Sequence, residues 1–254
     1  MSSIRSLYET HGGYVSDKWS AYLGVYDELF QPFKERPITL LEIGVQNGGS
    51  LQILDRYFPN AVKLVGCDID PRITKLEHGP KVNLIVGDVS QPITVAKIRH
   101  QSPTYDIIID DGSHRSDHII SAFESLFPLL KPGGFFLAED LHCSYSPSHR
   151  GRLFAPYSSI EYFKLLVDVV NADHWLNRWT DLLVARLKHP RRVAQLTTMV
   201  ELKRQIRSIR FFDSICVIEK ALVPTGLGTR VIAGREALVN PAPVKLRGEV
   251  TSDS

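Results

Sequence analysis

Residues 105–114 read YDIIIDDGSH, and residues 131–145 read KPGGFFLAEDLHCSY. In each segment a short apolar run ends in two acidic residues, which are Asp110, Asp111, Glu139 and Asp140. Short apolar runs bounded by Gly, Pro and Asp are typical of buried strands. The carboxyl ends of strands in an open α/β sheet are where ligands bind. Because His114 follows the first acidic pair, the pattern predicts a hard-cation site beside a general base.

Strand-like and helix-like segments alternate on either side of this stretch. The predicted strands are 38–43, 62–67, 82–86, 105–109 and 135–137, and the predicted helices are 50–58, 93–100, 114–130, 160–170 and 175–187. Such alternation implies a parallel sheet with right-handed crossovers. The runs 209–212 and 215–218 flank Asp213-Ser214 and predict an antiparallel hairpin. We therefore expect a Rossmann-like α/β fold with a mostly parallel seven-stranded sheet, a terminal antiparallel hairpin and helices on both faces.

Three segments are expected along the chain. Residues 1–36 form an N-terminal helical cap segment, in which Ser16-Asp17 is placed to cap the helix of WSAYLGVYDELFQPF. Residues 37–220 form the α/β domain, and residues 221–254 form an irregular C-terminal tail. No second globular domain is indicated.

Composition narrows the class of protein. The 254 residues are 43% hydrophobic and carry a net charge of +2, which gives no argument for a nucleic-acid partner. Basic residues concentrate between Arg186 and Arg210, as on a solvated helix face or a patch for an anionic substrate. The three cysteines lack CxxC spacing, and no apolar run is long enough to span a bilayer. We expect a cytoplasmic protein, with Cys67 and Cys216 as buried thiols.

The first predicted strand leads into a glycine-rich turn that indicates a nucleotide-like ligand. The segment LLEIGVQNGGS is followed, roughly 20 residues on, by a strand that ends in Asp68, where such folds place an acid on ribose hydroxyls. Glu42 precedes the turn and would repel a pyrophosphate, so the pattern favours S-adenosylmethionine (SAM) over NAD. Asp88 is placed either on the adenine amino group or as a cap. The cofactor-binding candidates are Glu42, Gly44, Gly48, Ser50, Asp68, Asp88 and Asp110.

These motifs, together with GCDIDP at 66–71, resemble class I SAM-dependent methyltransferases. They resemble more narrowly the metal-dependent sugar O-methyltransferases of macrolide biosynthesis (mycinamicin and macrocin type), with their cephalosporin-hydroxylase-like and rhamnosyl O-methyltransferase relatives. The resemblance covers about residues 14–145 and the terminal hairpin. It implies an enzyme that uses SAM and Mg²⁺ or Mn²⁺ to methylate a hydroxyl of a sugar or glycoside in an antibiotic, polysaccharide or glycolipid.

The resemblance also assigns roles to individual residues. Carried over by position, Asp111, Glu139 and Asp140 would hold the metal and His114 would be the catalytic base. Asp110 is then a cap or a structural partner, or lies on the cofactor side with Glu42. His142 and Tyr145 are expected near the substrate, and Tyr22 and Lys18 either close over SAM or serve packing. The resemblance leaves a homo-oligomer and a monomer open, because the sequence shows no counterpart of the long N-terminal extension that helps to build the oligomer and the substrate pocket of the macrolide enzymes.

Other interpretations stay open on the sequence alone. His118 follows His114 at helical spacing, and HxxxH can bind zinc, although no third ligand is evident. A cephalosporin-hydroxylase-like metal oxygenase shares the fold, but no two-His-one-carboxylate set is clear. A non-catalytic SAM-binding scaffold protein and a catechol-type methyltransferase are the remaining alternatives.

Overall fold

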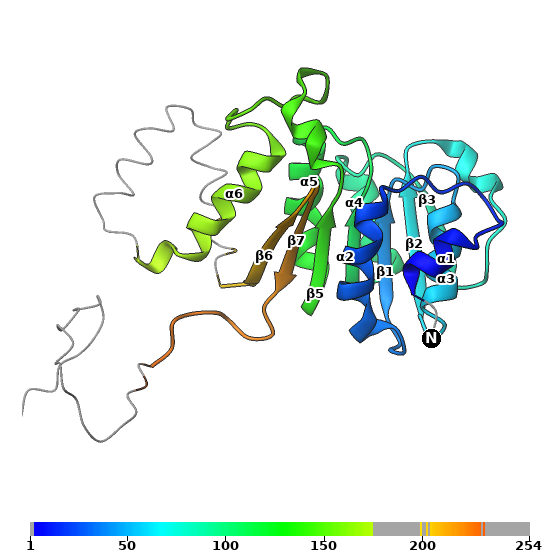
Figure 1. The fold of residues 1–254 in the computed structure, drawn as a ribbon, viewed down its shortest axis with the longest axis horizontal. Coiled ribbons are helices and arrows are strands. Elements are labelled where there is room, and N and C mark those ends of the chain that lie inside the picture. Colours follow the sequence, from blue (N-terminus) through cyan, green and yellow to red (C-terminus); the bar gives the residue numbers. More distant parts are fainter. Residues whose placement is uncertain (1–2, 175–198, 200–201, 203, 230, 232–254) are drawn as a thin grey trace, which may run out of the picture.

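The computed structural model describes residues 3–174, 199, 202, 204–229 and 231. Its seven strands form one sheet in the order β3-β2-β1-β4-β5-β7-β6 (Figure 1). The strands are β1 Thr39–Ile43, β2 Lys63–Asp68, β3 Val82–Val86, β4 Tyr105–Asp110, β5 Leu130–Ala138, β6 Ile206–Phe212 and β7 Ile215–Lys220. Strands β1 to β5 pair in parallel, whereas β7 pairs antiparallel with both β5 and β6. This arrangement confirms the predicted fold, including the terminal hairpin.

Helices cover both faces of the sheet, and each face has its own apolar core. One core joins helices α1 Ile4–Glu9, α2 Ser20–Phe30 and α3 Gly49–Tyr57 to the sheet. The other joins helices α4 Pro92–Gln101, α5 Ser116–Leu126 and α6 Ser159–Val170 to the opposite face. In Figure 1 the blue helix α2 crosses in front of the sheet. Because β1 and β4 are covered on both sides, every residue in them is buried and neither strand alternates.

Six short 3₁₀ helices complete the described structure. They are η1 Gln31–Phe33, η2 Pro71–Lys75, η3 Phe127–Leu129, η4 Leu141–Tyr145, η5 Pro147–His149 and η6 Ala172–His174.

The order of the strands reverses between β1 and β4, which is where open α/β sheets bind ligands. Backbone hydrogen bonds extend past the strand ends on both sides of this point. The N–H of Asp111 donates to the carbonyl of Ile43, and the N–H of Glu139 donates to the carbonyl of Asp110. These bonds hold the acidic pairs that follow β4 and β5 side by side, as the sequence pattern predicted.

Two local predictions were wrong. Ser16-Asp17 does not cap the second helix, because α2 begins after Trp19 and has no side-chain cap. The helix predicted from His114 begins only at Ser116, and His114 has a left-handed backbone with φ 56°. His114 and His118 therefore do not lie on one face of a helix. The alternative prediction of an HxxxH zinc site loses its geometric basis.

The cysteines, the C-terminal segments and the helix lengths can also be compared with the sequence predictions. Cys67 and Cys216 are buried thiols, as expected. The predicted helix 175–187, most of the basic run and most of the tail lie outside the described residues. None of the helices in the described part of the chain combines the length and apolar character that crossing a membrane requires.

Candidate active site

A cavity of about 440 Å³ lies at the carboxyl ends of β1, β4 and β5, and we call it the acidic cavity. The N-terminal strap, residues 15–19, forms one wall. The predicted metal, base and substrate residues that line it are Asp111, His114, Glu139, Asp140 and His142. The sheet thus brings together residues that the sequence places on two separate strand ends.

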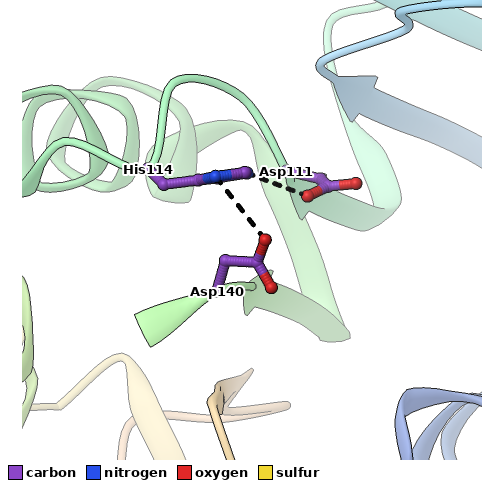
Figure 2. Close-up of side chains that lie close together, drawn as sticks. All are labelled: Asp111, His114 and Asp140. Atoms are coloured by element: carbon purple, nitrogen blue, oxygen red, sulfur yellow. Dashed lines mark hydrogen bonds and ion pairs between the residues drawn. The ribbon is translucent and has the colours of Figure 1, made fainter. Parts of the chain in front are cut away.

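Three of these residues form a compact group of donors. Ligand atoms of Asp111, His114 and Asp140 all lie within 4.8 Å of one another. Figure 2 shows the imidazole of His114 between the two carboxylates, with Nε2 3.1 Å from Oδ1 of Asp111 and Nδ1 3.5 Å from Oδ2 of Asp140. Each side chain is partly exposed to the cavity. Carboxylate oxygens beside one imidazole suit a hard or borderline divalent cation, so this chain's residues fit a metal.

Backbone strain is concentrated at the same place. His114 has φ 56°, Asp140 has φ 54° and Gln46 has φ 51°, and all three line the acidic cavity. A non-glycine residue in the left-handed region costs of order 1–3 kcal/mol, and such residues cluster at functional sites. The side chains of His114 and Asp140 lie 3.5 Å apart at this strained corner, which supports a functional role for it.

Glu139 has different partners from its two neighbours. Its Oε1 accepts a hydrogen bond from the hydroxyl of Tyr26, and its Oε2 lies 2.6 Å from the Nζ of Lys18. The same ammonium lies 2.5 Å from Oδ2 of Asp111. Glu139 is fully buried and the Lys18 side chain is only 2% exposed. Lysine, rather than solvent, therefore fills the space between the two carboxylates.

Electrostatics in this corner follow from burial and from the close acids. Burial alone would lower the pKa of Lys18, but Glu139, Tyr26 and Asp111 outweigh it and raise the pKa well above its ordinary value. Lys18 is therefore an ammonium. Burial likewise lowers the pKa of His114, yet the hydrogen bond to Asp111 and the charge of Asp140 raise it overall. Asp111 and Asp140 therefore stabilise the protonated form of the His114 imidazole.

A second cavity of about 210 Å³ adjoins the acidic cavity. The two share Gly44, Asp68 and Gly112, and the second is lined further by Asp88 and Asp110. Four of the predicted cofactor residues therefore face it: Gly44, Asp68, Asp88 and Asp110. Oδ2 of Asp110 is buried without a hydrogen-bond partner, which is an open acceptor at this wall.

The strand-end acids of the second cavity are fixed by the backbone. Asp68 accepts N–H bonds from Gln46 at 2.8 Å and from Asp70 at 2.9 Å. Asp88 accepts an N–H bond from Ser90 at 2.9 Å in the turn before α4, whose N-cap Gln91 has no side-chain cap, and Asp88 lines the second cavity. Backbone N–H groups use one lone pair of each carboxylate oxygen, so further acceptor capacity remains for ligand hydroxyls.

The glycine-rich turn serves the fold as well as a ligand. Gly44 has φ 89°, and a Cβ there would lie 2.0 Å from the carbonyl oxygen of Asp111. Gly49 lies against the strap and the residue before it, because a Cβ there would lie 2.5 Å from the carbonyl oxygen of Val15 and 2.2 Å from that of Tyr14. Gly48 lines a third cavity near His11, apart from the first two. Close approach of backbone to backbone therefore explains Gly44 and Gly49.

Glu42 lies beneath the turn, fully buried. Its Oε1 accepts a 2.6 Å hydrogen bond from the hydroxyl of Ser50, and its Oε2 has no partner. Burial, partly offset by the charge of Lys18, raises the pKa of Glu42 to about 7. Ser50 lines the acidic cavity, whereas Glu42 lies behind it. Glu42 therefore does not line the acidic cavity itself, and its contact with a residue that does is the hydrogen bond from Ser50.

The two predicted substrate residues, His142 and Tyr145, do not line the same cavity. His142 lines the acidic cavity and makes an edge-to-face contact with Trp19, with ring centroids 6.0 Å apart. Tyr145 lies instead in a neighbouring hollow of about 410 Å³, which His142 also borders. Trp19 is 61% exposed and lines the acidic cavity. The cavity mouth thus carries an aromatic platform that the sequence did not indicate.

Sequence reasoning underestimated the N-terminal residues. Lys18 lies 93 residues from Asp111, and Tyr22 donates a 2.6 Å hydrogen bond to Asp140 from 118 residues away. His118 was not placed at the cofactor either, although it lines the second cavity and its Nδ1 lies 2.8 Å from the Ser113 hydroxyl. No local spacing rule reveals such contacts, because α2 reaches the site only after packing on the sheet.

Comparison with known proteins supplies independent findings. Residues 41–141 match the family model described as a methyltransferase domain. The chain is 34% identical over 215 residues, 81% of its length, to 8-demethyl-8-alpha-L-rhamnosyl tetracenomycin-C 2'-O-methyltransferase of Streptomyces olivaceus, of which it covers 52%. It is 30% identical over 178 residues, 64% of its length, to 8-demethyl-8-(2-methoxy-alpha-L-rhamnosyl)-tetracenomycin-C 3'-O-methyltransferase of the same organism, of which it covers 44%. The chain thus spans about half the length of the curated relatives it matches.

A solved structure agrees in fold. It is that of the MycE methyltransferase from the mycinamycin biosynthetic pathway in complex with Mg, SAH and mycinamycin VI. The TM-score is 0.70 at 23% identity, and the match covers 87% of this chain and 54% of that one.

Proposed function

The chain carries a methyltransferase domain homologous to those of sugar O-methyltransferases, and from this premise we propose that it transfers the methyl group of SAM to a hydroxyl of a sugar or glycoside with the help of a divalent cation. The observation that carries the proposal is the pair of joined cavities at the switch point of the sheet. One is bordered by the strand-end acids Asp68 and Asp88, and the other by the donor group of Asp111, His114 and Asp140.

The second cavity suits the nucleoside part of SAM. Asp68 has spare acceptor capacity for ribose hydroxyls, and the unpaired Oδ2 of Asp110 offers an acceptor to an amino group. Both cavities are lined by Gly44, Asp68 and Gly112, which supports one ligand that extends across both. The methionine part would then lie in the acidic cavity near Ser50. The MycE structure, which shares this fold, contains SAH.

The acidic cavity suits the reacting half of the cofactor and the acceptor. Asp111 and Asp140 would hold the cation, and Glu139 stays a predicted ligand whose oxygens are hydrogen-bonded to Tyr26 and Lys18. When bound, SAM supplies the methyl group and Mg²⁺ or Mn²⁺ stabilises negative charge on the acceptor oxygen. Mg is also present in the MycE structure.

His114 is the proposed general base. It accepts the proton of the acceptor hydroxyl as the oxygen is methylated, and the neighbouring carboxylates stabilise the imidazolium that results. Asp111 orients the ring through Nε2. Because Nε2 is hydrogen-bonded to Asp111, Nδ1 is the nitrogen that takes the proton. With both nitrogens used in this way, His114 as base stays outside the metal's ligand set.

A sugar acceptor is supported by the relatives and by the cavity mouth. Both curated relatives are named for methyl transfer to rhamnosyl tetracenomycins. Trp19 presents an exposed ring at the entrance, and a flat aromatic face is suited to the apolar face of a pyranose. His142, held by the Ser214 hydroxyl at 2.7 Å, offers a polar partner beside it. Tyr145 in the adjoining hollow would contact a larger aglycone.

Residues 1–36 contribute to this site, and we propose that they act as its cap. The N–H of Gly49 donates to the carbonyl of Val15, so the strap covers the first turn of α3. Residues 15–19 then close the acidic cavity on the side away from the sheet.

The donor group also bears on the oxygenase alternative. Asp111, His114 and Asp140 supply one imidazole and two carboxylates, whereas non-haem iron oxygenases use two histidines and one carboxylate. Among the described residues the geometry favours methyl transfer.

Incubation with methyl-labelled SAM and a panel of rhamnosides and deoxysugar glycosides tests the proposal. Label is expected in an O-methylated sugar with Mg²⁺ and without iron or oxygen. A product that is hydroxylated, and that forms only with iron and oxygen, would assign the site to the oxygenase class instead.

A further inference from the structure

The polar wall of the second cavity is rich in hydrogen-bond acceptors. Asp68, Asp88 and Asp110 line it with carboxyl groups. Such a wall suits the ribose hydroxyls and the amino group of a nucleoside, because each of these groups donates a hydrogen bond. The ring nitrogens N1 and N7 of adenine are themselves acceptors, so they need a donor on the protein. A cavity that reads the base must therefore offer a donor beside its acids.

Apart from the carboxyl groups, three side chains that line this cavity carry a hydrogen to donate: Cys67, Ser113 and His118. The thiol of Cys67 lies 3.6 Å from the carbonyl oxygen of Gly87, to which it donates. The hydroxyl of Ser113 lies 2.8 Å from Nδ1 of His118. Nε2 of His118 has no hydrogen-bond partner in the part of the chain that the structure describes. This nitrogen is the side-chain donor left for a ligand.

The contacts of Ser113 favour the tautomer of His118 that carries its hydrogen on Nε2. The backbone N–H of Arg115 donates to the Ser113 hydroxyl oxygen at 3.4 Å, so this oxygen already acts as an acceptor. The hydroxyl hydrogen can then point at Nδ1 of His118, which leaves the imidazole hydrogen on Nε2. A protonated imidazole also carries a hydrogen on Nε2. The ring therefore offers a donor in both states.

His118 and Asp88 form an acceptor and donor pair although they come from different elements. His118 lies in the first turn of α5, whereas Asp88 follows β3. Hydrogen bonds from Ser90 lower the pKa of Asp88, and the charge of His118 lowers it further, so the two side chains lie within electrostatic reach. Adenine presents the complementary pair, because its amino group donates and the ring nitrogen beside that group accepts.

We propose that His118 recognises the adenine base of SAM, with Nε2–H donating to N1 or N7 while Asp88 accepts from the amino group. Ser113 positions the imidazole ring through Nδ1. The inference rests on the proposed function, because it concerns the nucleoside that this function places in the second cavity. It gives the second histidine of the segment DDGSHRSDH, residues 110–118, a role separate from the metal and from the general base.

The test measures binding of SAH, 1-deaza-SAH and 7-deaza-SAH to the full chain by isothermal titration calorimetry. Each analogue replaces one ring nitrogen with a C–H group that cannot accept a hydrogen bond. The wild type should bind at least one analogue about tenfold more weakly than SAH, because a donor in the site loses its partner. His118→Phe removes the donor and keeps a flat ring. It should bind SAH about tenfold more weakly and should lose the penalty for one analogue.

Three further variants separate the hydrogen bond from packing. His118→Gln keeps an N–H donor on a side chain of similar length, so it should restore the analogue penalty, which a purely structural role of the ring would not do. His100→Phe is the matched control, because His100 lies on α4 and lines neither cavity, and it should bind all three ligands like the wild type. If His118→Phe does not fold, His118→Leu removes the donor and is interpreted in the same way.

The other outcomes separate this inference from the proposed function. Penalties that persist for every analogue in His118→Phe overturn the role of His118 and leave the proposed function intact. Loss of both penalties at once also overturns it, because a single donor addresses a single nitrogen. Equal binding of SAH and both analogues by the wild type overturns it as well. Absence of SAH binding by the wild type overturns the cofactor part of the proposed function together with this inference.

Discussion

The ammonium of Lys18 lies 2.5 Å from a carboxylate oxygen of Asp111, across 93 residues of sequence. Asp111 stands at the end of β4 in the middle of the sheet, whereas Lys18 lies in the strap that precedes α2. The contact ties the N-terminal segment to the residues proposed to bind the metal. The proposed active site therefore depends on the packing of α2 as much as on the strand ends.

Replacement of His114 should remove most of the activity without unfolding the protein. His114→Ala is expected to lower the methyl-transfer rate by about 10²–10⁴-fold, because the acceptor hydroxyl loses its general base. Turnover is measured with labelled SAM, and thermal unfolding shows whether the fold persists. His149→Ala is the control, since the His149 ring is hydrogen-bonded to the Ser148 hydroxyl and His149 lines neither cavity. Wild-type rates in His114→Ala would remove the histidine from the mechanism.

Asp68 should be required for the cofactor but not for the fold. Asp68→Ala is expected to weaken SAH binding at least about tenfold, because a charge-assisted hydrogen bond is worth about 1.5–3 kcal/mol. Isothermal titration calorimetry measures the affinity. Asp117→Ala removes an acid that pairs with Arg115 and Arg150 outside the two cavities, so it should bind SAH like the wild type. Equal affinity of both variants would place the nucleoside elsewhere.

Gly44 should tolerate no side chain. Gly44→Ala combines a left-handed backbone with a Cβ 2.0 Å from the carbonyl oxygen of Asp111. We expect a loss of about 3 kcal/mol or more in the free energy of unfolding, from strain of about 1–3 kcal/mol and overpacking of similar size. Gly24→Ala is the matched control, because nothing lies within 4 Å of a Cβ there and α2 should gain about 0.5–1 kcal/mol. Denaturant titration compares the two, and similar losses would contradict this reading of Gly44.

Glu42 should make the free energy of unfolding fall as pH rises. Burial raises its pKa from 4.5 to about 7, so below pH 4.5 the carboxyl is protonated in both states and its full contribution is present. Between the two values only the unfolded chain loses the proton, and above about pH 7 the contribution is gone. The difference amounts to about 3 kcal/mol at 1.36 kcal/mol per pKa unit.

Glu42→Gln isolates that contribution, because it keeps the shape and cannot ionise. Denaturant titrations from pH 4.5 to 8 should show a shallower decline in the variant than in the wild type. Parallel curves for the two proteins would mean that Glu42 does not titrate in this range.

The sheet and the two acidic strand ends were predictable because they depend on local pattern. The runs before Asp110 and Glu139 are short and apolar, and strand-end acids meet wherever parallel strands are neighbours. Asp68 and Asp88 were placed at the ligand edge for the same reason.

The contacts of the N-terminal segment could not be predicted from local sequence patterns. Nothing near Lys18 in the sequence indicates that its ammonium lies between Asp111 and Glu139, because that contact exists only after α2 packs on the sheet. The left-handed backbone of His114 was missed for a related reason. The apolar periodicity of α5 extends the predicted helix backwards, whereas the tight turn after β4 delays its start to Ser116.

Metal-dependent methylation of a sugar hydroxyl is tested most directly by one measurement. Transfer of labelled methyl from SAM to a rhamnosyl glycoside is followed before exhaustive EDTA treatment, after it, and after Mg²⁺ is restored. The account predicts transfer that is lost on chelation and recovered with Mg²⁺. Transfer that survives exhaustive chelation undiminished would contradict the metal's role, and absence of transfer to every glycoside by a protein that binds SAH would contradict the proposed function.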